Sequence, residues 1–198
     1  MYSMLFVTMA LSTYNVGDKI SQEHLDVTFD ICFGDDETVS FGEYENNSVI
    51  YINMSATWWI PCYQNLLEGD QAYLNWKDNS RVKVFTVLDA IYPTPGCTDC
   101  AFNCSGWASA PSGSVDANNN PISPPIIDDG REPDKVIWNW FPDTGIEYPR
   151  NIFINHEMEV YYIIEDDMTA LEVGVIIQLM LDDMPDVISG CTDALACN

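Results

Sequence analysis

The most informative segment of this 198-residue chain reads Ile52-Asn53-Met54-Ser55-Ala56-Thr57-Trp58-Trp59-Ile60-Pro61-Cys62. It begins in residues 49–54, a nearly all-apolar run that predicts a central strand covered on both faces of a sheet. It leads into residues 62–76, where recurring apolar positions predict a helix. The segment therefore lies at a junction between a strand and a helix, with a cysteine at the start of the helix.

The surrounding sequence predicts an α/β domain. Residues 82–88 form a second apolar strand, so the order strand, helix, strand predicts a right-handed parallel crossover. Further strands and helices are predicted at residues 27–33, 38–41, 134–141, 151–154, 160–164 and 169–183. Thr169 and Glu172 have the spacing of a capping box at the start of the last helix, and Pro185 ends it.

Between the second central strand and the next helix, residues 92–133 are rich in Pro, Gly, Ser, Asn and Cys and show little periodicity. A stretch of this length without regular structure is uncommon inside a compact domain, so it predicts an inserted loop.

The motif residues Thr57, Trp58, Trp59, Pro61 and Cys62 resemble the active-site region of secreted thioredoxin-like thiol–disulfide oxidoreductases and their peroxiredoxin relatives. In that family a central strand runs into Ala-Thr-Trp-Cys-x-x-Cys at a helix start. The chain departs from the pattern at Trp59, which stands where the family has its nucleophilic cysteine. An indole cannot supply the thiolate that disulfide exchange needs.

A second landmark is the segment Tyr148-Pro149-Arg150-Asn151-Ile152-Phe153-Ile154-Asn155, which resembles the cis-proline segment of the same family. Pro149 would be that proline, facing the cysteine motif. The resemblance covers residues 16–183 without the insertion. It implies a thioredoxin-like three-layer α/β/α sandwich with a mixed central sheet, an N-terminal β extension and a long cysteine-containing loop, within a domain at 13–188.

Three interpretations of the site stay open. In the first, Cys62 is a single redox thiol for thiol–disulfide or peroxide chemistry, with Pro149 facing it and Arg150 lowering the thiolate pKa. The peroxiredoxin pattern Pro-x-x-x-Thr-x-x-Cys is not matched, because Thr57 lies five residues before Cys62. In the second, Cys97, Cys100 or Cys104 of the insertion supplies the missing thiol. In the third, the domain is a redox-inactive binding or structural module.

The cysteine content predicts an oxidising, extracytoplasmic compartment. The chain has seven cysteines, so at least one stays unpaired within a single chain. Cys191 and Cys197 are expected to close a small disulfide loop within residues 189–198, which resemble repeats that trail secreted proteins of marine bacteria. Residues 1–12 contain a short apolar run typical of a signal-peptide core.

Composition excludes several classes of partner. The chain has 7 basic and 31 acidic residues, a formal net charge of −24, which repels nucleic acids and anionic membranes. No segment is long and apolar enough to predict a transmembrane helix. Cys97, Cys100 and Cys104 could ligate zinc, but no fourth ligand lies nearby, so we expect disulfides and neither metal nor cofactor. The expected substrate is a protein thiol or disulfide, or a peroxide.

Overall fold

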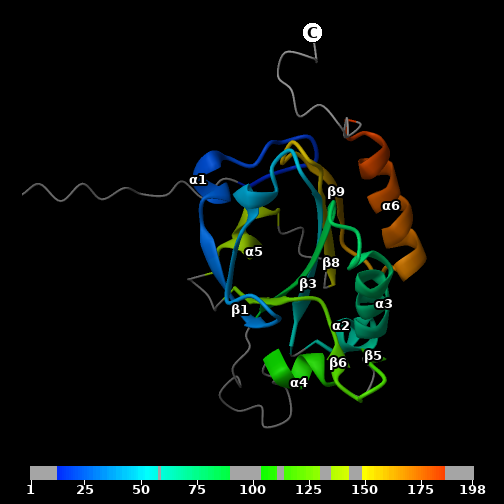
Figure 1. Cartoon of the computed structure of the whole chain (residues 1–198). Helices are drawn as coiled ribbons and strands as arrows, with labels where there is room; N and C mark the ends of the chain where they lie inside the picture. Colours follow the sequence, from blue (N-terminus) through cyan, green and yellow to red (C-terminus); the bar gives the residue numbers. More distant parts are fainter. Residues whose placement is uncertain are drawn as a thin grey trace, which may run out of the picture.

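The computed structural model describes residues 13–57, 59–89, 104–110, 114–129, 135–142 and 149–185. Within this part of the chain the centre is a seven-stranded mixed sheet in the order β2-β1-β7-β4-β3-β8-β9 (Figure 1). Its strands are β1 (Thr28–Phe33), β2 (Thr38–Ser40), β3 (Val49–Ala56), β4 (Val82–Asp89), β7 (Ile126–Asp128), β8 (Arg150–Ile154) and β9 (Val160–Ile164).

The middle of the sheet confirms the predicted parallel crossover. β3 and β4 run parallel in a continuous register, from Val49 opposite Val82 to Ala56 opposite Asp89. Every residue of β3 is buried, as expected for an apolar strand covered on both faces. β8 pairs with the other edge of β3 in the antiparallel direction, which makes the sheet mixed.

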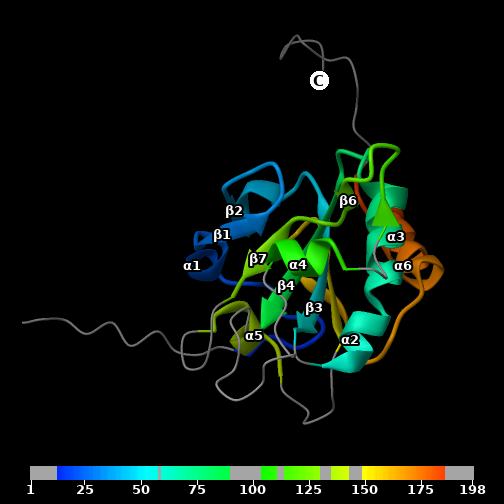
Figure 2. The same ribbon diagram turned by 90° about the horizontal axis from the view of Figure 1, so that it is seen from below.

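Helices cover both faces of the sheet and give the three layers that the sequence predicts (Figures 1 and 2). One face carries α1 (Gln22–Leu25), the 3-10 turn η1 (Phe41–Tyr44) and α5 (Ile137–Trp140), with Phe41 and Trp140 fully buried in its core. The other face carries α2 (Ile60–Gln64), α3 (Leu66–Trp76) and α6 (Ala170–Asp182), with Val173, Ile177 and Met180 buried beneath α6. Among the described residues no helix is long and apolar enough to cross a membrane.

Two predicted helices differ in outcome. The helix expected at 62–76 begins earlier, at Ile60, and is divided at Asn65 into α2 and α3. Pro61 in the first turn favours this earlier start, because its missing N–H would have no partner there in any case. The last helix is confirmed together with its capping box: the Thr169 N–H donates to the Glu172 carboxylate at 2.9 Å, and the Glu172 N–H donates to the Thr169 hydroxyl at 3.3 Å.

The expectation of a structureless loop over residues 92–133 is wrong for part of that range. It contains α4 (Cys104–Ala108), the small hairpin of β5 (Ser114–Val115) and β6 (Pro121–Ile122), and the sheet strand β7. β7 runs parallel to β4 and antiparallel to β1, so it connects the β1–β2 extension to the central sheet. Burial of Ile126 and Ile127 in the core accounts for this placement.

Candidate functional site

Cys62 lies in the first turn of α2, directly beyond the carboxyl end of β3. Its side chain is only 1% exposed. It belongs to an apolar cluster formed by Ala56, Cys62, Leu66, Leu88, Cys104, Trp107, Ala108, Ala110 and Ile126. Trp59 is the residue immediately before α2 and packs half-buried against this cluster. A large apolar side chain therefore occupies the helix start where the resemblance places a nucleophile.

The thiol of Cys62 is held in its neutral form. Burial raises its pKa to about 11, and the nearby carboxylate of Asp167 acts in the same direction. Three groups oppose this shift: the Ala56 backbone N–H, which donates to Sγ at 3.4 Å, the Ser55 side chain and the backbone of Cys62 itself. Desolvation outweighs these hydrogen bonds, so the thiolate that attacks disulfides or peroxides is scarce near neutral pH.

A buried network of neutral polar side chains extends from the thiol into the core on the α3 and α6 side of the sheet. Ser55 donates to the Asn53 amide oxygen at 2.6 Å, and Asn53 donates to the Asn151 amide oxygen at 3.2 Å. Tyr51 donates to that same Asn151 oxygen at 2.7 Å. The amides do not titrate, and burial raises the pKa of Tyr51 above its ordinary value, so the phenol stays neutral. The network therefore contains no general base for Cys62.

Sequence reasoning did not assign these polar residues to the site. The available signal was the alternation of Asn53 and Ser55 with Ile52 and Met54, which places the two polar side chains on one face of β3. The partnership with Asn151 depends on the register of β3 with β8, which pairs Asn53 directly with Asn151.

Arg150 is occupied by other partners. Its Nε lies 3.0 Å from a Glu165 carboxylate oxygen, and its guanidinium carbon lies 5.4 Å from the centre of the Trp138 ring. The Arg150 side chain is 3% exposed, so this is a buried ion pair. Within the described chain, the charged side chain that shifts the Cys62 pKa is Asp167, and Arg150 is not among the groups that do so. The arrangement supports Arg150 as a bridge between β8 and α5.

The remaining motif residues are partly described. Pro149 is buried immediately before β8. Thr57 is buried at the end of β3, where its N–H donates to the Asp89 carbonyl at 3.4 Å. Pro61 lies in the first turn of α2, whereas Trp58 lies outside the described residues. The same holds for four cysteines: Cys97, Cys100, Cys191 and Cys197.

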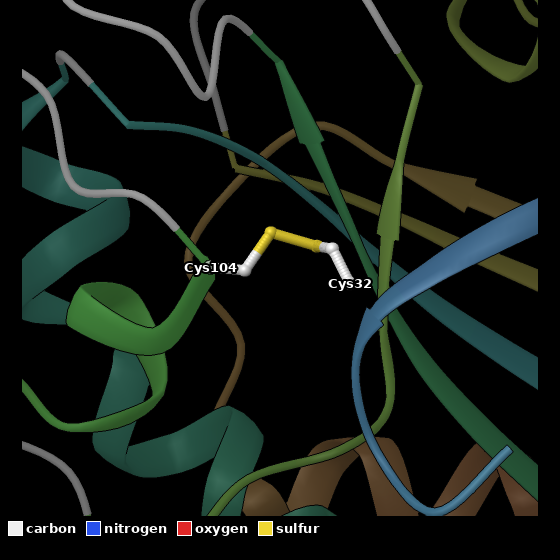
Figure 3. The surroundings of a disulfide bond; sticks show 2 residues. All are labelled: Cys32 and Cys104. Carbon is white, nitrogen blue, oxygen red and sulfur yellow. A yellow bond between two sulfur atoms is a disulfide. The ribbon is translucent and has the colours of Figure 1, made fainter. Parts of the chain in front are cut away.

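Cys104 is not the partner of Cys62, which corrects one of the sequence-based expectations. It forms a disulfide with Cys32, with 5.9 Å between the two Cα atoms (Figure 3). The reason lies in the packing of α4, since α4 contacts β1 and its first residue faces the end of that strand. Cys62 is the free cysteine of the described residues. Within the same residues, no group of three or more His, Cys, Asp or Glu side chains is placed to hold a metal ion.

Neither a protein-family model nor a curated protein sequence matches this chain. Solved structures do match. A candidate protein disulfide isomerase of Bacteroides thetaiotaomicron has a TM-score of 0.59 at 14% identity, over 87% of this chain and 92% of that protein. A secreted thiol-disulfide isomerase of Corynebacterium glutamicum has a TM-score of 0.57 at 12% identity, over 84% of this chain and 92% of its own length.

A thiol:disulfide interchange protein of the thioredoxin family from Chlorobium tepidum is similar as well. It has a TM-score of 0.53 at 16% identity, over 73% of this chain and 87% of that protein. These similarities show that the chain has the thioredoxin-like fold of thiol–disulfide oxidoreductases, as the sequence motif implied. At such identities the likeness concerns the fold alone.

Proposed function

We propose that this chain is an extracytoplasmic protein of the thioredoxin-like redox type that no longer performs the usual exchange chemistry and acts as a binding module. In this proposal the chain keeps the scaffold that holds a substrate against the cysteine motif in oxidoreductases of this fold, whereas Cys62 serves as a structural thiol. Its partner would be a protein, as for the disulfide isomerases and interchange proteins that share the fold.

The observation that carries the proposal is the state of the Cys62 sulfur. A side chain that is 1% exposed offers an attacking reagent almost no access. With the pKa at about 11, about one molecule in ten thousand carries the thiolate near neutral pH. Trp59, the residue just before α2, replaces the first cysteine of the motif, which excludes a mechanism that uses two cysteines within the motif. Burial and protonation together argue against nucleophilic catalysis.

Extracytoplasmic location is supported by the disulfide between Cys32 and Cys104, since such bonds persist in oxidising compartments and are rare in the cytosol. The secreted isomerase of Corynebacterium glutamicum shares the fold. The apolar run in residues 1–12 is consistent with export.

A second candidate function is slow thiol–disulfide or peroxide chemistry through Cys62 alone. It is favoured by the Ala56 N–H and the Ser55 side chain, because hydrogen bonds to sulfur stabilise the thiolate once it forms. This mechanism requires a transient opening that exposes Sγ, and Pro149 would face the incoming disulfide as the resemblance implies.

One experiment separates the two functions. The folded protein is incubated at neutral pH with oxidised glutathione, and in parallel with hydrogen peroxide, and its intact mass is followed alongside that of a Cys62→Ala variant. The binding-module proposal expects no adduct and no oxidation of Cys62 in the time that a guanidinium-unfolded sample needs for complete reaction. A glutathione adduct or peroxide consumption that disappears in Cys62→Ala would refute it in favour of the second function.

A further inference from the structure

The outer side of α6 is unusually apolar for a surface helix. Leu171 is 78% exposed, Val175 54% and Leu179 46%. Their spacing of four residues places the three side chains on one side of the helix. The opposite side of α6 already provides the core with Val173, Ile177 and Met180. Figure 1 shows α6 in the outer layer of helices that covers one face of the sheet, so the side of α6 opposite its core residues faces outward. The helix thus has a second apolar stripe that the described part of the fold does not use.

Two hollows flank this stripe, and Leu171 and Val175 line both of them. The first, of about 500 Å³, lies between α6 and the end of β9, with Ile164, Met168 and Ile176 in its wall. The second, of about 330 Å³, lies toward α3, with Trp76 in its wall. Side chains of a partner could enter on either side of the helix, so the surface offers pockets as well as apolar area.

Gly174 helps to form the second hollow. A Cβ at this position would lie 3.6 Å from the indole nitrogen of Trp76, so the absence of a side chain leaves the edge of Trp76 accessible. Glycine inside a helix normally lowers helix stability relative to alanine. Its presence at the edge of the hollow fits a surface shaped to receive a side chain.

The rim of the surface is acidic. Asp166, Asp167 and Glu172 line the first hollow, and Asp182 and Asp183 follow Leu179 at the end of α6. The residues that line the two hollows include no lysine or arginine. The pKa of Asp167 is raised mainly by burial and additionally by the neighbouring negative charge of Asp166.

We propose that the α6 face, defined as Leu171, Val175 and Leu179 with the two hollows beside them, docks a basic amphipathic helix of a partner protein. Leu or Met side chains of that helix would fill the hollows, and flanking Lys or Arg would meet the acidic rim. A second copy of this chain fits poorly, because each copy carries a net charge of −24 and would bring its own acidic rim. An anionic membrane is disfavoured for the same reason.

This inference rests on the proposed binding function and adds a second surface, on α6, with its own partner chemistry. The probe is a fluorescent helix-forming peptide of leucine and lysine with leucine at helical spacing, titrated into the full chain and followed by anisotropy. The proposal expects saturable binding that weakens at least tenfold in Leu171→Asn and in Val175→Asn. Val115→Asn is the matched control, since Val115 is 55% exposed on β5, and it should leave the affinity unchanged.

The outcome that overturns the proposal is binding that is unaffected by the two α6 substitutions, which indicates non-specific charge attraction, or binding that weakens equally in Val115→Asn, which indicates apolar contact that is not specific to α6. Circular dichroism and the urea midpoint confirm that each variant is folded. A peptide of leucine and glutamate with the same spacing should not bind, and equal binding by that peptide would also overturn the proposal.

Three further measurements exclude other occupants. If sedimentation equilibrium finds a dimer of the wild type that the Val175→Asn substitution dissociates, the face binds a second copy of the chain. Binding to neutral phosphatidylcholine vesicles would assign it to lipid, and protection of Leu171 from hydroxyl-radical labelling in the free protein would assign it to the chain itself. Each of these results contradicts the proposal. The α6 variants leave Cys62 intact, so a reactive Cys62 and a failed α6 face are distinguishable results.

Discussion

The backbone N–H of Ala56 donates to the Sγ of Cys62 across 3.4 Å, which connects the last residue of β3 to the first turn of α2. This contact places the sulfur beneath the strand end, within the apolar cluster. The hydrogen bond stabilises a thiolate only partly, because the desolvation that accompanies burial has the larger effect on the pKa. The position that the sequence marks as reactive is therefore a protected one.

Alkylation of Cys62 by iodoacetamide should be slow and strongly dependent on pH. With the pKa raised from 9.0 to about 11, the thiolate fraction near neutral pH is about a hundredfold lower than for an unperturbed thiol. We expect the rate to rise about tenfold per pH unit as long as the protein stays folded. Asp167→Asn should speed the reaction, because it removes a negative charge that raises the pKa, whereas Glu157→Gln in the exposed turn should not. A rate that is independent of pH would contradict this account.

Trp59→Cys should restore disulfide reductase activity. The substitution places a thiol at the start of α2, where helix N–H groups favour a thiolate, and recreates a Cys-x-x-Cys pair with Cys62. The expected result is a gain of insulin reduction in the presence of dithiothreitol and an internal disulfide that mass spectrometry maps to positions 59 and 62. Trp59→Ser is the matched control and should stay inactive. If the folded Trp59→Cys variant showed no activity, the substrate-facing surface would differ from that of the oxidoreductases that share the fold.

The disulfide between Cys32 and Cys104 should be a major source of stability. It closes a loop with a sequence separation of 72 residues, for which chain entropy predicts a loss of about 4 kcal/mol when the bond is removed. The combined variant Cys32→Ser and Cys104→Ala should lower the free energy of unfolding in urea by about that amount. Reoxidation of the reduced wild type should regenerate the same bond. If a disulfide between Cys104 and Cys62 formed instead, the result would support the interpretation in which a cysteine of the insertion supplies the thiol that reacts with Cys62.

The sequence predicted the central elements because their patterns are local. The strand before Cys62, the strand that ends at Asp89 and the capped helix α6 each show a clear period, and all are confirmed. β7 was missed because it is three residues long, follows two prolines and gains its stability from β4 and β1, which are distant in sequence. Such a strand is determined by tertiary pairing and not by its own composition.

The candidate site could be predicted only in part. Cys62 could be identified because it matches a known motif, and Trp59 because it replaces the cysteine that the motif normally has. The hydrogen bond from Asn53 to Asn151 depends on strand register, and the partner of Cys104 depends on how α4 packs on β1. Seven cysteines allow many pairings, so sequence alone could not choose among them.

Asp70 should make the stability depend on pH. It is buried in α3, where its carboxylate accepts the Ser114 N–H at 2.9 Å, and burial raises its pKa to about 7 from 3.8. Because the folded pKa is the higher one, the unfolded chain loses this proton first as pH rises. The contribution of Asp70 therefore becomes less favourable between these two values and stays unfavourable above them.

Asp70→Asn should accordingly be more stable than the wild type by about 3–4 kcal/mol near pH 8, and nearly equal to it near pH 4. The amide oxygen can still accept the Ser114 N–H. Urea unfolding at both pH values measures the difference, and Asp78→Asn on the exposed surface is the control that should show none. A variant that is less stable than the wild type at the higher pH would indicate that the carboxylate is favourably bound.

Arg150 and Glu165 should be strongly coupled in stability and uninvolved in Cys62 reactivity. The ion pair is buried, with side chains 3% and 11% exposed. Removing one partner leaves an uncompensated charge, so Arg150→Met should cost about 3–5 kcal/mol, whereas the combination with Glu165→Gln should cost clearly less than the sum of the two. A double-mutant cycle by urea unfolding measures the coupling. In the folded double variant the alkylation rate of Cys62 should match that of the wild type, because Arg150 is not among the groups that shift its pKa. A folded double variant with a several-fold slower reaction would return Arg150 to the role that the sequence motif first suggested.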